Sequence, residues 1–323
     1  MSNGRRVINV DRLKIFTGRA HPQLAEEICS VLGVALGQSE IIKFANDNSF
    51  VRIKESVREA DVFVVQPSCQ PVNDGLMELL IMIDALKRAS VRRLTAVTTY
   101  FPYGRSDKKD QPRISITARL VADLLQVAGV DRILALDLHS PQIQGFFSVP
   151  VDHLTAVPIL AGYFAEKKLE NLVVVAPDAG RAKMARQFAR HLKAPMAIID
   201  KRRIGNQDNV VAEHVIGDIA GRVCLIVDDE ISSGASLVAA AETVSRFGAS
   251  KIYAAVTHPT LSGMAPQRIL SSKIDELVVT NSVPVPEEKR NHKITVLSIA
   301  HLVGEAIRCI HQGNSVSTVF EKE

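Results

Sequence analysis

Two adjacent carboxylates and a hydroxyl-rich turn follow one apolar segment of this 323-residue chain. Residues 223–227 are apolar, Asp228 and Asp229 come next, and a turn of small residues then opens a helical pattern. The turn consists of Ser232, Ser233, Gly234, Ala235 and Ser236. Backbone N–H groups at a helix N-terminus bind phosphate, and carboxylates accept hydrogen bonds from sugar hydroxyls. The segment predicts a sugar-phosphate site; a helix capped by Ser or Asp without a ligand is the alternative.

Further polar residues stand where other apolar runs end. They are His139, Asp178, Lys201 and Arg203, which follow the runs 132–137, 172–176 and 196–199. Considered alone, a histidine such as His139 is more often a hydrogen-bonded structural residue. A solvated basic turn is likewise the alternative for Lys201 and Arg203.

Two polar segments interrupt the apolar patterns. Residues 103–115 are charged and contain little apolar material, which predicts a long surface loop. Residues 44–50 form a shorter polar segment between two phenylalanines. By spacing alone, the first is a charged surface loop and the second a polar turn.

Strand and helix patterns alternate along the chain. Apolar runs typical of buried strands occur at residues 61–66, 94–98, 132–137, 172–176, 196–199, 223–227, 252–256 and 277–280. Helical patterns occur at residues 22–32, 74–89, 116–128, 156–167, 180–192, 236–247 and 300–311. The alternation predicts an α/β fold of mostly parallel sheets flanked by helices. Because such sheets bind ligands beyond the carboxyl ends of their strands, the polar residues above stand where a site is expected.

The length of the chain favours two domains. Residues 149–158 contain two prolines and separate two comparable sets of strands. We therefore expect an N-terminal domain over residues 1–155, a C-terminal domain over residues 156–313 and a short tail at residues 314–323.

Composition limits the classes of function. The net charge is +4 and the basic residues are scattered, which argues against a nucleic-acid-coating surface. No apolar run approaches the roughly 18 residues of a membrane span, and the polar N-terminus lacks a signal-peptide pattern, so a cytoplasmic protein is expected. The four cysteines are far apart and are expected to be structural thiols.

The acidic strand end and the turn after it resemble the ribose-phosphate motif of type I phosphoribosyltransferases and ribose-phosphate diphosphokinases. Residues 137–147, DLHSPQIQGFF, are very similar to the diphosphokinase signature, and residues 175–180 to its second metal-side loop. Similar segments run through residues 73–80, 101–105 and 200–203. The resemblance covers nearly the whole chain and implies two domains of the type I phosphoribosyltransferase kind.

The resemblance to the diphosphokinases implies transfer of the terminal diphosphate of ATP to O1 of ribose 5-phosphate, with Mg²⁺ as cofactor. It implies that His139 and Asp178 contact the metal, and that Lys201, Arg203, Lys108 and Lys109 stabilise the transferring group. The implied ATP contacts are Phe44, Asn46, Asp47, Asn48, Arg105, Ser106, Asp110 and His139. Ribose 5-phosphate would be held by Arg203, Asp228, Asp229 and the turn from Ser232 to Ser236.

Several residues depart from the family pattern. Asn46, Asp47 and Asn48 replace the commoner aspartate, glycine and glutamate of the adenine segment, which bears on nucleotide selectivity. Arg181 stands where glycine is usual. In the ribose-phosphate motif the departures are Glu230, Ser232, Ala235 and Ser236, and in the catalytic loop they are Gln111, Pro112 and Ile114.

Two other functions compete with this interpretation. A phosphoribosyltransferase shares the sugar-phosphate motif, but two domains and the signature at residues 137–147 oppose it. A non-catalytic regulatory paralogue should have lost loop or metal residues, which are retained here. The resemblance further implies a homohexamer and an allosteric phosphate or ADP site near Ser315 and Ser317.

Overall fold

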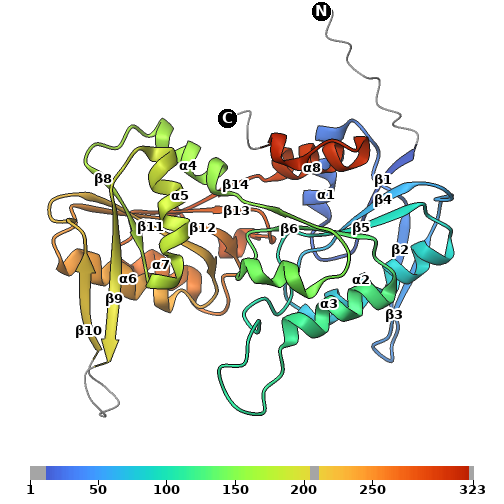
Figure 1. Ribbon diagram of the computed structural model, residues 1–323, viewed down its shortest axis with the longest axis horizontal. Coiled ribbons are helices and arrows are strands. Elements are labelled where there is room, and N and C mark those ends of the chain that lie inside the picture. The colour runs from blue at the N-terminus through green and yellow to red at the C-terminus, as the bar shows by residue number, and fades with distance from the viewer. Residues whose placement is uncertain (1–11, 204–210, 320–323) are drawn as a thin grey trace, which may run out of the picture. The chain divides into compact units, whose positions relative to one another are not determined.

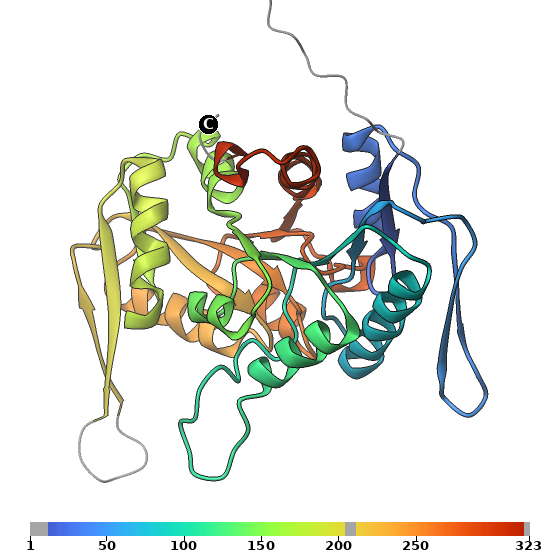
Figure 2. The same ribbon diagram turned by 45° about the vertical axis from the view of Figure 1, so that its right-hand side comes forward.

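The computed structural model describes residues 12–203 and 211–319 (Figures 1 and 2). Side chains are described for all of these residues except those between 201 and 213. The chain divides into two compact units. Unit 1 contains the chain up to Leu154 together with the segment from Ile299 onward, and unit 2 contains Thr155–Ser298. Both units are parallel-sheet α/β structures, which confirms the expected fold class.

Unit 1 is built on a five-stranded sheet of order β1-β4-β5-β6-β7, in which every neighbouring pair is parallel. The strands are β1 (Leu13–Thr17), β4 (Asp61–Val65), β5 (Arg93–Thr98), β6 (Arg132–Leu136) and β7 (Val151–Leu154). The helices are α1 (Pro22–Leu32), α2 (Val72–Arg88), α3 (Thr117–Ala128) and α8 (Ala300–Gln312), with 3-10 turns η2 (Pro141–Phe146) and η5 (Val316–Val319).

The sheet of unit 1 explains the apolar runs of the sequence. All five residues of β4 are buried, because helices cover both faces of a parallel sheet. Helix α2 turns Leu79, Met82, Ile83 and Leu86 toward the core, and this spacing is the apolar face of a helix. A separate antiparallel hairpin, β2 (Ser39–Lys43) and β3 (Ser49–Ile53), lies beside α2 (Figure 2).

Unit 2 is built on a seven-stranded sheet of order β10-β9-β8-β11-β12-β13-β14. The strands are β8 (Leu172–Ala176), β9 (Met196–Arg203), β10 (Val211–Ile216), β11 (Val223–Ile231), β12 (Lys251–Pro259), β13 (Glu276–Thr280) and β14 (Ile294–Leu297). Only the edge pair β9 and β10 is antiparallel among the described strands of this sheet. The helices are α4 (Val157–Glu166), α5 (Ala182–Leu192), α6 (Ala235–Arg246) and α7 (Ala265–Ser271), with 3-10 turns η3 (Ala179–Arg181) and η4 (Glu287–Lys289).

Helix α8 belongs to unit 1, whereas we expected residues 300–311 to complete the C-terminal domain. It packs against α1 (red beside blue in Figure 1), and a Cβ placed on Gly304 would lie 2.9 Å from Val31 Cγ1. Such a short distance shows how closely the two helices approach. The chain thus returns to its first unit after completing the second.

Candidate functional site

The signature segment of unit 1 begins where β6 ends, as expected from the sequence. Asp137 is buried and has a φ of 35°, a strained conformation for a residue other than glycine. The Leu138 N–H donates to His153 Nε2 at 2.9 Å, which holds the turn against β7. His139 follows, half-buried, before the 3-10 turn η2. The histidine proposed for metal contact therefore stands on a rigid turn at the carboxyl edge of the sheet.

The structure brings His139 together with the start of the charged loop. A Cβ placed on Gly104 would lie 3.6 Å from the Cβ of His139. The rings of Phe101 and Phe147 meet edge to face with centroids 5.9 Å apart, so the two segments also share an apolar contact. Two motifs that are separated in the sequence thus form one surface in unit 1.

Hydrogen bonds to Ser106 connect the two ends of the charged loop. Its hydroxyl accepts a hydrogen bond from the Thr117 N–H at 3.3 Å, and its carbonyl accepts from the Ala118 N–H at 3.1 Å. These bonds satisfy N–H groups at the start of α3 that have no partner within the helix. Beyond this anchor, Lys108, Lys109 and Asp110 are exposed, as is Arg105 at the start of the loop.

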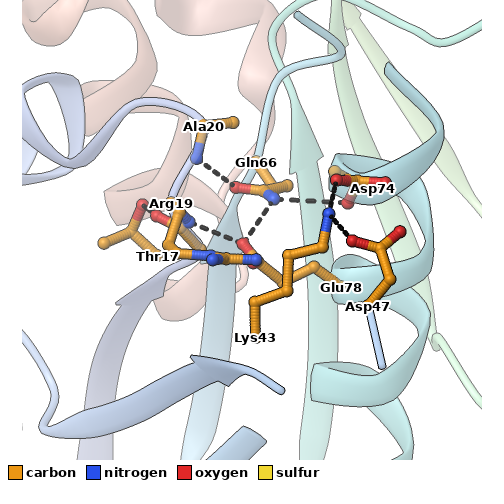
Figure 3. A network of polar contacts seen from close by, with 10 residues as sticks. Thr17, Arg19, Ala20, Lys43, Asp47, Gln66, Asp74 and Glu78 are labelled. Carbon is orange, nitrogen blue, oxygen red and sulfur yellow. Dashed lines mark hydrogen bonds and ion pairs between the residues drawn. The ribbon is translucent and has the colours of Figure 1, made fainter. Parts of the chain in front are cut away.

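The segment expected to contact adenine is the tip of the β2–β3 hairpin. Phe44 and Phe50 are 50% and 40% exposed, with ring centroids 5.9 Å apart. Asp47 has a φ of 70° and turns the chain, and its carboxylate lies 2.7 Å from Lys43 Nζ. Lys43 also binds Asp74 of α2 at 2.6 Å, which connects the hairpin to the helix (Figure 3). The tip therefore exposes two aromatic rings on a turn that ion pairs of Lys43 stabilise.

Sequence reasoning missed a buried polar network beneath this edge of unit 1. Glu78 is 2% exposed and accepts hydrogen bonds from Arg19 Nε at 2.6 Å and from Gln66 Nε2 at 3.0 Å (Figure 3). A Cβ on Gly18 would lie 2.4 Å from Glu78 Oε1, so a side chain there would have to displace the network. The network locks the ends of β1 and β4. An acid on the core face of an apolar helix was the signal in the sequence.

In unit 2, Asp178 follows β8 at the carboxyl edge of the sheet. It caps the turn η3, because its Oδ1 accepts a hydrogen bond from the Arg181 N–H at 3.1 Å. A Cβ placed on Gly180 would lie 3.0 Å from the same oxygen. The carboxylate is exposed, as a group that contacts a soluble ligand must be.

The two acids of the sugar-phosphate motif lie within β11, which continues to Ile231 rather than ending at residue 227 as expected. Their side chains are 18% and 4% exposed, and the Arg181 guanidinium binds both. Burial raises the pKa of Asp228 to about 8, and a hydrogen bond and the charge of Asp229 act in the same direction, against the opposing charge of Arg181.

The turn that is predicted to bind a phosphate lies directly between β11 and α6. Gly234 has a φ of 76° and precedes α6, while Ser233, Ala235 and Ser236 are exposed. Arg268 donates to the Ser233 carbonyl at 2.8 Å, and the Ser262 N–H donates to the Ser232 carbonyl at 3.0 Å. The turn is thus held from behind while its hydroxyls and the helix N-terminus face outward.

Lys201 and Arg203 lie in β9 and pair with Glu213 and Val211 of β10. The side chains of these residues are outside the described part of the structure. Their role therefore stays a prediction from the sequence.

The described residues contain no group of three or more His, Cys, Asp or Glu side chains that could hold a metal ion. Mg²⁺ bound with a nucleotide keeps several waters and takes most of its other ligands from phosphate oxygens. The imidazole of His139 in unit 1 and the exposed carboxylate of Asp178 in unit 2 are each of a type that can contact such an ion. Among the described helices, none has the length and apolarity required to cross a bilayer.

Comparison with known proteins places both units in one family. Residues 13–129 match the model for the N-terminal domain of ribose phosphate pyrophosphokinase. Residues 206–321 match the model for the phosphoribosyl synthetase-associated domain.

Individual relatives cover almost the whole chain. A ribose-phosphate pyrophosphokinase from Bacillus caldolyticus is 49% identical over 311 residues, which is 96% of this chain and 98% of the relative. One from Caldanaerobacter subterraneus subsp. tengcongensis is 52% identical over 310 residues, covering 95% and 98%. The crystal structure of phosphoribosylpyrophosphate synthetase from Mycobacterium smegmatis has a TM-score of 0.89 and 44% identity, covering 94% of this chain and all of that one. The chain therefore belongs to the ribose-phosphate pyrophosphokinase family of enzymes.

Proposed function

We propose that this chain transfers the β,γ-diphosphate of Mg-ATP to O1 of ribose 5-phosphate, giving 5-phosphoribosyl 1-diphosphate and AMP for nucleotide biosynthesis. The observation that carries the proposal is the pair Asp228 and Asp229 at the end of β11, directly before the exposed N-terminus of α6. Carboxyl groups that can bind sugar hydroxyls are therefore adjacent to backbone N–H groups that can bind a phosphate.

Unit 2 would bind ribose 5-phosphate. The 5-phosphate would sit in the cradle from Ser232 to Ser236, where hydroxyls and helix N–H groups are exposed. The carboxylates of Asp228 and Asp229 would then accept hydrogen bonds from ribose O2 and O3. Arg203 would add a cation near the sugar.

Unit 1 would bind ATP. The exposed rings of Phe44 and Phe50 offer surfaces for adenine, and Asn46, Asp47 and Asn48 offer polar groups for the purine edge. Arg105, Ser106, Lys108, Lys109 and Asp110 belong to the loop that would contact the triphosphate. The anchor of this loop at Ser106 and Thr117 would allow its exposed tip to close over the nucleotide while its base stays in place.

Mg²⁺ would enter with ATP, and His139 and Asp178 would hold it directly or through water. Bound to the phosphates, the ion neutralises negative charge and orients the diphosphate. The residues of the chain supply the rest of the positive charge, from Lys201, Arg203, Lys108 and Lys109.

The expected reaction is an in-line attack of ribose O1 on the β-phosphorus, with AMP leaving. Transfers of this kind need little covalent help, so positioning and charge stabilisation supply most of the acceleration. The acids and the cradle hold the nucleophile, while the cations stabilise the charge that develops on the transferring group. No general base is assigned.

Phosphorus NMR of a mixture of protein, ATP, Mg²⁺ and ribose 5-phosphate tests the proposal. We expect signals of phosphoribosyl diphosphate and AMP without any nucleobase, and no product when EDTA removes the metal. A phosphoribosyltransferase would form no AMP under these conditions, and a regulatory paralogue would be inactive alone. Product formation that needs a nucleobase, or none at all, would refute the assignment.

The tail of the chain suggests regulation. A pocket of about 310 Å³ in unit 1 is lined by Arg93, Arg132, Ser315 and Ser317 among others. Asp152 also lines this pocket and pairs with Arg132, and Arg93 pairs with Asp61, so an anion would bind beside existing ion pairs. The two serine hydroxyls and the arginines are the groups that could contact the allosteric phosphate or ADP that the resemblance implies near Ser315 and Ser317. Assembly into a homohexamer is likewise proposed from the resemblance. Titrating phosphate into the assay, with sedimentation in parallel, tests both ideas.

A further inference from the structure

Arg181 binds the two acids that are proposed to hold the ribose. Its Nε lies 2.9 Å from Asp228 Oδ1, and its Nη2 lies 2.8 Å from Asp229 Oδ1. The three side chains are 17%, 18% and 4% exposed, so the contact is largely shielded from water. Hydrogen bonds from a guanidinium in such surroundings are much less screened than those on the surface.

The two N–H donors of Arg181 are arranged like the two hydroxyl donors of a sugar diol. The Nε–H and Nη2–H groups project from the same edge of the planar guanidinium, and each donates to a different acid. Ribose O2–H and O3–H are also two neighbouring donors on one edge of a ring. The arginine thus makes with Asp228 and Asp229 the pair of hydrogen bonds that the substrate is expected to make.

The backbone places Arg181 at the acids. β8 and β11 are neighbouring parallel strands, so the turn after β8 lies next to the end of β11. The Arg181 N–H is held by Asp178 Oδ1 at 3.1 Å, which fixes the start of the side chain. The side chain can therefore leave the acids while the turn η3 keeps its place.

We propose that Arg181 occupies the place of the ribose 2,3-diol, and that ribose 5-phosphate binds only after displacing the guanidinium from Asp228 and Asp229. The inference rests on the proposed function. A ligand with both hydroxyls and a 5-phosphate replaces both hydrogen bonds to the acids and gains the cradle. Because every sugar phosphate must displace the arginine from the free protein, the arginine weakens the binding of ribose 5-phosphate and of 2-deoxyribose 5-phosphate by the same factor.

Calorimetric titration of ribose 5-phosphate into the full-length protein without ATP provides the first test. We expect Arg181→Ala to bind the sugar phosphate about tenfold more tightly than the wild type, which corresponds to about 1.4 kcal/mol. Arg181→Lys keeps the charge but lacks the paired donors, and it should also bind more tightly. Arg186→Ala removes an exposed arginine from α5, the helix that follows Arg181, and should match the wild type.

Kinetics and a second ligand make the test specific. In the AMP-forming assay, Arg181→Ala should lower the KM for ribose 5-phosphate and leave kcat nearly unchanged, because the residue competes with the substrate in the ground state. Ribose 5-phosphate and 2-deoxyribose 5-phosphate should both bind more tightly to the same variant, by similar factors. A purely structural role would reduce kcat or thermal stability without tightening the binding of either ligand.

The failure of this inference can be told from failure of the proposed function. In one outcome the wild type binds ribose 5-phosphate and forms AMP, but Arg181→Ala and Arg181→Lys bind the sugar equally or more weakly. Arg181 is then no competitor, so the inference is overturned while the proposed function stands. If neither the wild type nor the variants bind ribose 5-phosphate and no AMP forms, both fall together.

Discussion

Arg93 grips Asp61 through two hydrogen bonds, Nε to Oδ1 at 2.8 Å and Nη2 to Oδ2 at 2.6 Å. Both residues lie at the starts of neighbouring strands, β4 and β5. The same carboxylate accepts from His311 Nδ1 at 2.7 Å, and Arg93 also donates to the Ile310 carbonyl at 2.8 Å. This cluster fastens the end of α8 to the sheet of unit 1.

Asp61→Asn should destabilise unit 1 by about 2 to 3 kcal/mol, because it leaves the half-buried guanidinium of Arg93 without its charged partner. Asp61 is 1% exposed, so solvent offers the pair little compensation. The transition midpoint in urea, followed by circular dichroism, measures the effect. Asp84→Asn breaks a pair with Arg88 whose side chains are 55% and 80% exposed, and it should shift the midpoint little. Equal shifts in both variants would contradict this account.

The carboxylate of Asp61 also makes the stability of unit 1 depend on pH. Burial raises the pKa of Asp61, but hydrogen bonds from His311 and Arg93 outweigh it and hold the pKa below the ordinary value of 3.8. The stabilisation is therefore complete above that value and is lost as the pH falls through the lower pKa of the folded state. The difference in Tm between wild type and Asp61→Asn should narrow in strong acid. A difference that stays constant from neutral pH into that range would rule out the linkage.

Gly234→Ala should raise the KM for ribose 5-phosphate. The residue has a φ of 76°, where a side chain costs about 1 to 2 kcal/mol, so the turn would shift to relieve strain and misplace the cradle. Gly221→Ala is a matched control, because that glycine has a φ of 70° with open space around it, outside the cradle. Both variants should lose similar stability, and only the first should lose affinity in initial-rate assays. A KM that rises equally in both would show that the effect is not local.

Lys201→Ala should lower kcat by about 10²-fold or more, since one preorganised charge at a developing anion is worth roughly 3 kcal/mol. Lys251→Ala removes an exposed lysine from the opposite, amino end of a strand in the same sheet and should leave kcat unchanged. Quenched-flow measurement of AMP gives the turnover rates. Wild-type turnover in Lys201→Ala would remove this residue from the catalytic machinery.

Alkylation should divide the four cysteines into two pairs. Burial, helped by the charge of Glu26, raises the pKa of Cys29 to about 11, and burial raises that of Cys224 to about 12 against the opposing charge of Arg222. Their thiolate fractions at mildly alkaline pH are therefore very small. Mass spectrometry after brief treatment with iodoacetamide should find Cys69 and Cys309 modified first, and Cys29 and Cys224 only after unfolding. Early modification of Cys224 would show that β11 opens readily.

Much of the architecture could be predicted because it depends on local pattern. Buried strands appear in the sequence as apolar runs, and amphipathic helices appear as 3.6-residue periods, so the α/β class and most elements from β4 to β13 follow from neighbouring residues. The elements β7, β10 and α7 in that range were not predicted. The turn before α6 could also be predicted, since a glycine among serines after an apolar strand is a local signal, whereas its role in binding phosphate stays a prediction. The family likeness extends this prediction to the whole chain.

Other features depend on which distant segments become neighbours. Arg181 reaches Asp228 only because β8 and β11 are adjacent in the sheet, although β9 and β10 separate them in the sequence. In the same way, α8 joins unit 1 through α1 and Asp61, which are far away along the chain. The periodicity of apolar residues predicts whether a residue is buried. The residue that pairs with a buried charge depends instead on the order of the strands and on how the helices pack. Tertiary structure therefore decided which cation contacts the two acids.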